Sequence, residues 1–358
     1  MTMTNGHLSV EDVLAGLFLL LYGSIGLSIN LLVSWPMCQM CNEIVGFRFL
    51  LSQVVIDILL LIQFGVWPGI VILSQEELVP QYYRWHLHLY LDFTWWSRVY
   101  HYAIIAWTRF AAIKWPNWFR CLSHTTCAFI YMVPWIAALI QSIIEHQFDW
   151  FKPLYYDPTL YGLTTDWKAY SQSGTGDYYA FCNIVSMILP FPFYGLAFYV
   201  LLRRNSRNLV HTTRIRQRSR QDFILTSAIV RRQYIIESRL LIPCVINTVI
   251  FVFGEIFVVL CTLYSGKWIT WLMIVSFASN SFVNPIIYST FSGAIRIRLM
   301  RMFHTLFDSN IFSKNCAYRS SCASSTFYQQ QRSSGNIRGK EMNVLYTNSF
   351  TSMEEIRR

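Results

Sequence analysis

Seven long apolar segments alternate with shorter polar ones along the chain. They cover about residues 13–35, 49–73, 88–113, 126–144, 178–202, 240–263 and 269–288. Each is close to the roughly 20 residues that a helix needs to cross the hydrocarbon core of a bilayer. Because no water is available there to satisfy an open backbone, the segments are expected to be helices. The pattern predicts an all-α bundle of seven transmembrane helices over residues 13–288, preceded by a short extracellular segment, residues 1–12.

The third segment is the least apolar of the seven, since it contains His88, Asp92, Arg98, His101 and Arg109. We include it because its neighbours require a crossing between them. The interior of a helical bundle also accepts polar side chains that face inward. The third helix is therefore expected to carry a polar inner face.

Composition agrees with a membrane protein, because charged residues make up only 13% of the chain, against about 25% in soluble domains. The net charge of +10 does not predict a nucleic-acid partner, since the basic residues lie between the apolar segments. With the amino terminus extracellular and the carboxyl terminus cytoplasmic, 24 of the 29 lysines and arginines are on the inner side. This bias predicts the orientation of a multi-pass protein of the plasma membrane.

A basic segment follows the seventh helix. In residues 289–303, apolar side chains recur at helical spacing with arginines between them, which predicts an amphipathic helix in contact with membrane lipid. Residues 304–358 are rich in polar residues and are expected to form a disordered cytoplasmic tail. Cys316 and Cys322 in this tail are candidates for acylation.

The most specific motif closes the seventh helix and consists of Asn280, Ser281, Asn284, Pro285 and Tyr288. It resembles the NSxxNPxxY pattern of the rhodopsin-like receptor superfamily. Proline removes a backbone donor and kinks the helix, and an asparagine beside it can cover the freed carbonyl. Such a segment can hold two arrangements, although an Asn-Pro pair also occurs as a simple kink in transporter helices.

Further positions resemble the markers of the same superfamily. Gly26 and Asn30 lie in the first helix, Asp57 in the second, Arg109 at the inner end of the third, and Trp135 in the fourth. The resemblance implies a rhodopsin-like fold, and it implies that Arg109 couples the receptor to a heterotrimeric G protein.

A charged side chain in the middle of the membrane costs about 2.5–3.5 kcal/mol, so Asp57 needs a partner. In the superfamily this carboxylate shares a polar pocket with the asparagines of the seventh helix and often with a sodium ion. Arg98 lies about 16 Å along the third helix from Arg109. We hypothesise that Asp57 and Arg98 pair directly, within a polar switch that includes Asn30. The alternative is that Arg98 stacks on Trp95 or reaches elsewhere.

Four residues are candidates for binding a ligand: Asp92, Trp95 and Trp96 of the third helix, and Glu255 of the sixth. An ionisable group inside the membrane is by default a functional hypothesis. Aromatic neighbours accept a cation or a flat molecule. An aromatic cluster at the outer headgroups is the alternative interpretation.

The sequence departs from the superfamily pattern in three ways. Thr108 replaces the usual acid before Arg109, so a raised basal activity is expected. The Cys-Trp-x-Pro motif of the sixth helix is absent. No cysteine lies between Cys41 and Cys121, so the usual extracellular disulfide to the third helix is missing.

Longer segments resemble the nematode serpentine chemoreceptors of class X, a divergent branch of the same superfamily. They include residues 46–57, 109–116, 155–158 and 231–237, and the resemblance covers about residues 25–303. It implies a chemosensory receptor of the sensory cilium, which binds a small environmental molecule in the outer half of the bundle and signals to a G protein.

Three other functions remain open: a ligand-gated channel, which would require the opposite orientation; a transporter, although no internal repeat is evident; and a receptor-like trafficking partner that does not signal. An enzyme is not expected, because phosphate-binding loops and hydrolase motifs are absent from the sequence. No cofactor is predicted. No metal site is predicted either, because His86 and His88 do not share a helical face.

Overall fold

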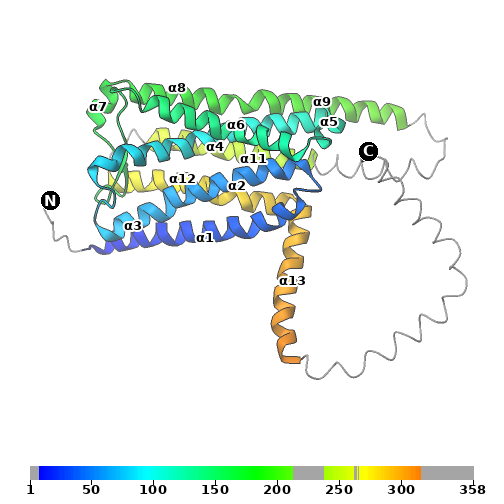
Figure 1. Cartoon of the computed structure of the whole chain (residues 1–358), viewed down its shortest axis with the longest axis horizontal. Helices are drawn as coiled ribbons and strands as arrows, with labels where there is room; N and C mark the ends of the chain where they lie inside the picture. Colours follow the sequence, from blue (N-terminus) through cyan, green and yellow to red (C-terminus); the bar gives the residue numbers. More distant parts are fainter. Residues whose placement is uncertain (1–7, 213–237, 262–263, 265, 316–358) are drawn as a thin grey trace, which may run out of the picture. The chain divides into compact units, whose positions relative to one another are not determined.

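The computed structural model describes residues 8–212, 238–261, 264 and 266–315 of the chain. It divides into two units, Met1–Leu299 and Met300–Arg358, and the first contains the helical bundle. Five of the long helices are continuous: α1 (Val10–Met40), α4 (Arg84–Lys114), α6 (His124–Glu145), α11 (Leu241–Cys261) and α12 (Lys267–Phe291). They lie side by side along the long axis of the bundle (Figure 1).

Two further crossings are each built from more than one helical piece. The second consists of α2 (Val45–Leu61), the π-helical turn η1 (Ile62–Val66) and α3 (Trp67–Ser74). The fifth consists of α8 (Thr175–Ile188) and α9 (Pro190–Thr212). The π turn directly precedes Pro68, and the break between α8 and α9 falls at Pro190. Both interruptions follow from proline, which cannot donate a backbone hydrogen bond.

Short elements close the two ends of the bundle. Strands β1 (Tyr155–Asp157) and β2 (Gly162–Thr164) pair antiparallel, with Tyr156 opposite Leu163. We call the end of the bundle that carries these strands the hairpin end. The short helices η2 (Gln81–Tyr83) and α7 (Trp167–Gln172) lie in loops at the same end. The opposite end, which we call the far end, carries α5 (Pro116–Arg120) (Figure 1).

Six of the seven crossings are long and apolar enough to span a membrane by composition alone. The exception is α4, whose buried side chains include Asp92, Arg98 and Arg109. On the other helices large apolar side chains face outward, for example Phe129 at 73% exposure and Phe181 at 67%. Because such surfaces are stable in lipid and not in water, the chain is an integral, multi-pass membrane protein.

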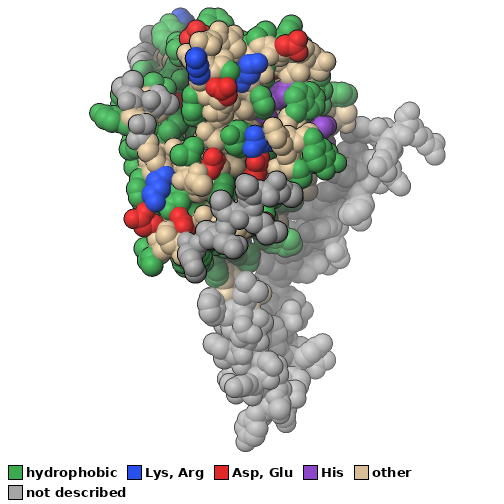
Figure 2. All heavy atoms as spheres, turned by 90° about the vertical axis from the view of Figure 1, so that its left-hand side faces the viewer, with side chains coloured by type: hydrophobic (Ala, Val, Ile, Leu, Met, Phe, Trp, Pro, Cys, Tyr) green, Lys and Arg blue, Asp and Glu red, His purple; other side chains and the backbone are tan. Residues whose placement is uncertain are grey.

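The charged side chains are concentrated at the ends of the bundle. Figure 2 looks onto the hairpin end, where lysine, arginine, acidic and histidine side chains gather on the surface. Hydrophobic side chains are visible around the rim of the bundle in the same view. This distribution matches a helical bundle whose flanks face lipid and whose ends face water.

Helix α1 packs closely against the second span where glycines of the two segments face each other. A Cβ atom on Gly65 would lie 2.7 Å from the Cα atom of Gly23, and one on Gly23 would lie 2.8 Å from the backbone nitrogen of Val66. Two backbones meet here without intervening side chains, as small residues permit in membrane bundles. The contact fixes the second span against α1 next to the π turn.

The last helix, α13 (Gly293–Asn315), follows α12 after a single residue. In its first turns Ile295 is fully buried, and Arg298 Nη2 forms a 2.5 Å ion pair with Glu43 Oε1. The sequence assigns residues from 304 onward to a disordered tail, and this boundary is wrong. The helix continues to Asn315 because the segment after Gly293 contains no further glycine or proline up to that residue.

Candidate functional site

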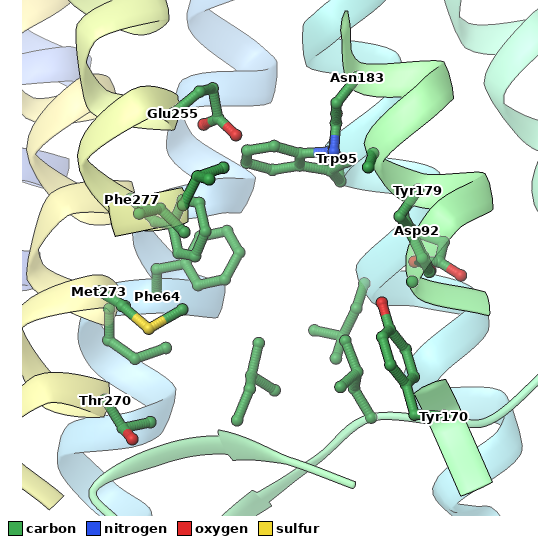
Figure 3. A pocket seen from close by; sticks show the side chains of 18 of the residues that line it. Phe64, Asp92, Trp95, Tyr170, Tyr179, Asn183, Glu255, Thr270, Met273 and Phe277 are labelled. Carbon is green, nitrogen blue, oxygen red and sulfur yellow. Dashed lines mark hydrogen bonds between the residues drawn. The ribbon is translucent and has the colours of Figure 1, made fainter. Parts of the chain in front are cut away.

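A cavity of about 680 Å³ opens at the hairpin end of the bundle. It lies between α4 and α8 on one side and α11 and α12 on the other, with η1 behind it (Figure 3). Residues of β2 and α7 also line it, so the loop at the hairpin end contributes directly to its wall. Its size is within the 300–1,000 Å³ range of small-molecule sites.

Helices α4 and α8 supply a hydrogen-bonded wall. Asp92 is almost fully buried and accepts a short hydrogen bond from the hydroxyl of Tyr179. One turn further along α4, the indole N–H of Trp95 donates to Asn183 Oδ1 at 3.1 Å. Asp92 and Trp95 are on one face because they are three residues apart in a helix. These bonds between α4 and α8 hold both side chains in place at the cavity.

The facing wall combines an acid with aromatic and apolar side chains. Glu255 of α11 is only 5% exposed, and its Oε1 has no hydrogen-bond partner among the described residues. In Figure 3 its carboxyl group points toward the cavity. Phe277 of α12 contacts Phe64 and Trp95, with ring centroids 4.9 and 5.1 Å apart.

The lining is acidic. Three of the described residues that line the cavity are carboxylates: Asp92, Asp177 and Glu255. The described lining contains no lysine, arginine or histidine. Two of these carboxylates are buried. Among the described residues, one oxygen of each buried carboxylate, Asp92 Oδ2 and Glu255 Oε1, has no hydrogen-bond partner. Because an unsatisfied buried carboxylate is costly, the site favours a ligand that brings a positive charge or hydrogen-bond donors.

Three of the four ligand-binding candidates line this cavity: Asp92, Trp95 and Glu255. The fourth, Trp96, does not. It is fully buried behind the wall, where its ring stacks on Tyr179 at 5.8 Å and its N–H donates to Glu145 Oε2 at 3.3 Å. Trp96 points away because consecutive residues in a helix do not share a face.

Sequence reasoning missed the α8 residues of the wall, Tyr179 and Asn183. It also missed Gln63 of η1, whose backbone carbonyl accepts a 2.5 Å hydrogen bond from the hydroxyl of Tyr156 in β1. This bond ties the hairpin to the second crossing. A tyrosine in an apolar helix is a weak signal, and nothing in the local sequence indicates which helix it will contact.

A polar network occupies the centre of the bundle. Asn284 Nδ2 donates to Asp57 Oδ2 at 2.8 Å, while Asn30 Nδ2 donates to the backbone carbonyl of Ser281 at 3.3 Å. Asn280 is also buried, with its amide against the backbone of Gly254 in α11. The markers of the seventh helix therefore meet those of the first and second helices, from which they are separated by more than two hundred residues in sequence.

The predicted direct pair between Asp57 and Arg98 does not form. Arg98 Nη1 instead donates to Ser281 Oγ at 2.9 Å, and Nη2 donates to the hydroxyl of Tyr102 at 3.2 Å. Its guanidinium also lies 5.5 Å from the ring centre of Phe251. The reason is that Asn284 takes one oxygen of Asp57, while Ser281, one turn earlier on α12, presents a hydroxyl to the arginine. The positive charge of Arg98 still lies in the expected network, but Arg98 joins it by a hydrogen bond to Ser281 of α12.

The remaining markers lie toward the far end. The hydroxyl of Tyr288 donates to Gln53 Oε1 at 2.9 Å, one turn after Pro285, which lies inside α12. Arg109 is fully buried and donates from Nη2 to the backbone carbonyl of Gly46 in α2 at 3.3 Å. Thr108 donates to the carbonyl of Ile105 in its own helix. Cys316 and Cys322 are outside the described residues.

Comparison with solved structures identifies the architecture. The crystal structure of squid rhodopsin superposes with a TM-score of 0.66 at 14% sequence identity, and the match covers 82% of each chain. The chain has the rhodopsin-like seven-helix fold. No family model matches the sequence, and no curated protein matches it.

The rhodopsin-like fold accounts for the position of both parts of the site. All seven crossings are present, including α4, which hydropathy alone does not identify. Within this fold, the cavity opens at one end of the helices and the polar network lies deeper between them. At 14% identity the likeness concerns the fold, and the resemblance to class X chemoreceptors stays a prediction.

Proposed function

We propose that the chain is a chemosensory receptor that binds a small molecule in the cavity at the hairpin end and signals to a heterotrimeric G protein at the far end. The hairpin end is then extracellular, as the distribution of basic residues predicts. The observation that carries the proposal is the 680 Å³ cavity inside a rhodopsin-like fold, lined by the buried carboxylate of Glu255, whose Oε1 has no hydrogen-bond partner among the described residues. The resemblance to class X receptors supports an environmental ligand detected at a sensory cilium.

We infer an amine as the ligand class. Glu255 and Asp92 face the cavity from opposite walls, and the aromatic rings of Trp95, Phe277 and Tyr170 lie between or beside them (Figure 3). A protonated amine would be held by a charge-assisted hydrogen bond to a carboxylate. Its apolar part would pack on the aromatic rings, which also attract a cation through their faces.

A chain of ring contacts joins the cavity to the polar network. Trp95, which lines the cavity, lies 6.1 Å from Phe251 of α11 between ring centres. Phe251 in turn stacks on Tyr102 at 4.6 Å and lies below the guanidinium of Arg98. A ligand that displaces Trp95 would therefore shift Phe251 and, through it, the guanidinium of Arg98, which is hydrogen-bonded to Ser281 of α12. In this proposal α12 is the element with two arrangements, because Pro285 weakens its backbone hydrogen bonds.

The ligand proposal is tested by expressing the receptor in a heterologous cell and measuring G-protein activation by matched amines, alcohols and carboxylic acids. Amines are expected to be the active class. The variant Glu255→Gln is expected to reduce the potency of an active amine by about 10- to 100-fold, since a hydrogen bond to a charged group contributes about 1.5–3 kcal/mol. Glu76→Gln, an exposed acid outside the cavity lining, is the matched control and should leave potency unchanged.

Two results would count against this assignment. One is a Glu255→Gln receptor that reaches the cell surface and keeps the potency of the wild type. The other is a response to carboxylic acids in preference to amines, because the acidic lining repels a carboxylate.

A further inference from the structure

Three potential metal ligands converge beside the cavity wall. His88 and Asp92 are one helical turn apart on α4, and His146 follows the last residue of α6. One ligand atom from each residue lies within 4.8 Å of the others, and all three side chains are buried. The histidine that joins His88 in this cluster is therefore His146, and not His86 or His101, which are closer to it in sequence.

The three side chains approach one another without forming hydrogen bonds among themselves. His88 Nε2 is 3.5 Å from Asp92 Oδ1, and His146 Nε2 is 3.9 Å from Asp92 Oδ2. Hydrogen bonds of this type are normally 2.7–3.2 Å long. Within the part of the chain that the structure describes, three buried atoms of the cluster have no hydrogen-bond partner: His88 Nδ1, Asp92 Oδ2 and His146 Nε2.

Neighbouring groups orient His146 and Asp92 as they do in metal sites, while His88 Nε2 lies 3.3 Å from the hydroxyl of Tyr179. The Nδ1 atom of His146 is 2.7 Å from the backbone carbonyl of Ser142, a contact that requires the proton on Nδ1 and leaves the Nε2 lone pair free. The hydroxyl of Tyr179 donates to Asp92 Oδ1 and leaves Oδ2 toward His146. A histidine that binds a metal typically donates its other N–H to such a carbonyl, which fixes its ring.

Aromatic rings surround the cluster and restrict its movement. Phe151 lies against both histidines, 5.4 Å from His88 and 5.1 Å from His146 between ring centres. Trp85 contacts the other side of His146 at 5.2 Å. The two histidine rings are 4.9 Å apart. The apolar shell excludes water, which strengthens the attraction between a cation and Asp92.

We propose that His88, Asp92 and His146 bind a zinc-class divalent ion. Two nitrogen and one carboxylate ligand form the donor set of a zinc site that keeps its fourth position open. In a tetrahedral site with zinc bonds of 2.0–2.2 Å, two ligand atoms lie about 3.3–3.6 Å apart. The 3.5 Å contact between His88 Nε2 and Asp92 Oδ1 matches this spacing. The 3.9 Å contact between His146 Nε2 and Asp92 Oδ2, and the remaining separations of up to 4.8 Å, reach it when the side chains rotate toward the ion.

The position of the site gives the ion a role at the cavity. Asp92 belongs both to the cluster and to the cavity lining. A bound ion would neutralise this carboxylate, and its open position would take water or a donor atom of a ligand. This consequence for ligand recognition rests on the proposed function, whereas binding of the ion does not.

The test uses the full chain, purified in detergent through a tag without histidine, and zinc chloride as the probe. The melting temperature is expected to rise with the logarithm of the zinc concentration, because the ion binds the folded state. Calcium chloride should have no effect, since Ca²⁺ requires six to eight oxygen ligands. Asp92→Asn and His146→Gln should each weaken zinc binding by more than about 100-fold, since losing even a residue that supports a ligand costs 10–100-fold.

His86→Ala is the matched control, because His86 is an exposed histidine of the same helix. It should keep the zinc response of the wild type. The proposal is overturned if the wild type shows no shift up to millimolar zinc, or if Asp92→Asn and His146→Gln respond as His86→Ala does.

Cobalt binding to the wild type provides a second measurement that needs no variant. Co²⁺ in a four-coordinate site absorbs visible light strongly, and zinc should remove these bands by competition at an equimolar ratio. A six-coordinate cobalt spectrum, identical to that of the ion in buffer, would overturn the proposal even if the two variants failed to fold.

Discussion

Arg98 carries a full charge at the centre of the bundle and is completely buried. Its two terminal nitrogens donate to Ser281 and Tyr102, while its Nε has no partner in the protein. Such a charge is tolerated only while its hydrogen bonds are made, because the cost of an unsatisfied buried charge is large. At the scale of single residues, the bond to Ser281 is therefore a polar contact that holds α12 against α4, beside the ring contact of Trp95 with Phe277.

Ser281→Ala is expected to destabilise the receptor by about 1–2 kcal/mol, since it leaves a buried charged donor unpaired. The measurement is thermal unfolding of the purified protein in detergent. Ser289→Ala is the matched control on the same helix, because the hydroxyl of Ser289 bonds only to the carbonyl of Ile286 in its own helix. Equal melting temperatures for the two variants would contradict the assigned role of Ser281.

At the scale of elements, the crossing of α1 with the second span depends on backbone contact. Gly23 and Gly65 meet beside the π turn η1, where an added Cβ would overlap backbone atoms that cannot move aside. The close contact fixes the position of the turn, to which Gly65 itself belongs. The turn carries Phe64 and Gln63, both of which line the cavity.

Gly65→Ala is expected to lower stability by about 1–3 kcal/mol, the usual cost of forcing an extra group into a packed interior. Gly195→Ala is the control, because nothing lies within 4 Å of a Cβ atom placed on this glycine of α9. It should be neutral or stabilise the helix by about 0.5–1 kcal/mol, since alanine favours helix over glycine. Loss of stability in Gly195→Ala, with none in Gly65→Ala, would show that the packing of α1 is described incorrectly.

The number and type of the crossings follow from the sequence because the bilayer imposes a length and a composition on each. The third helix is predictable only through its neighbours, since its polar face lowers its hydropathy. The β hairpin leaves no comparable pattern, because its strands depend on contacts with other elements. Pro68 marks an interruption of the second span, but it does not show that a π turn forms at Ile62–Val66.

The site is predictable in part for the same reason. Asp92, Trp95 and Glu255 are conspicuous because charge and aromatic groups are unusual inside a membrane. Tyr179, Asn183 and His146 come from distant segments, and the sequence does not show which helical faces meet. Local spacing likewise places Arg98 at the correct depth but does not determine which acceptor it uses.

At the scale of the whole molecule, α4 links the two functional ends. Asp92 lies at the cavity and Arg109 lies 17 residues later, about 26 Å along the helix. Between them Arg98 contacts α12 through Ser281 and α11 through the ring of Phe251. A ligand that shifts α4 against α11 and α12 would therefore change the surroundings of the network and of Arg109 together.

The most direct test of this account is G-protein activation by an active ligand in cells, compared between the wild type and Arg109→Ala. An antibody against an amino-terminal tag on intact cells measures the amount of receptor at the surface. The account predicts that the tag is accessible, that the wild type responds, and that Arg109→Ala loses the response while still binding the ligand. A full response from Arg109→Ala at equal surface level, or a tag that is hidden until the cells are permeabilised, would contradict it.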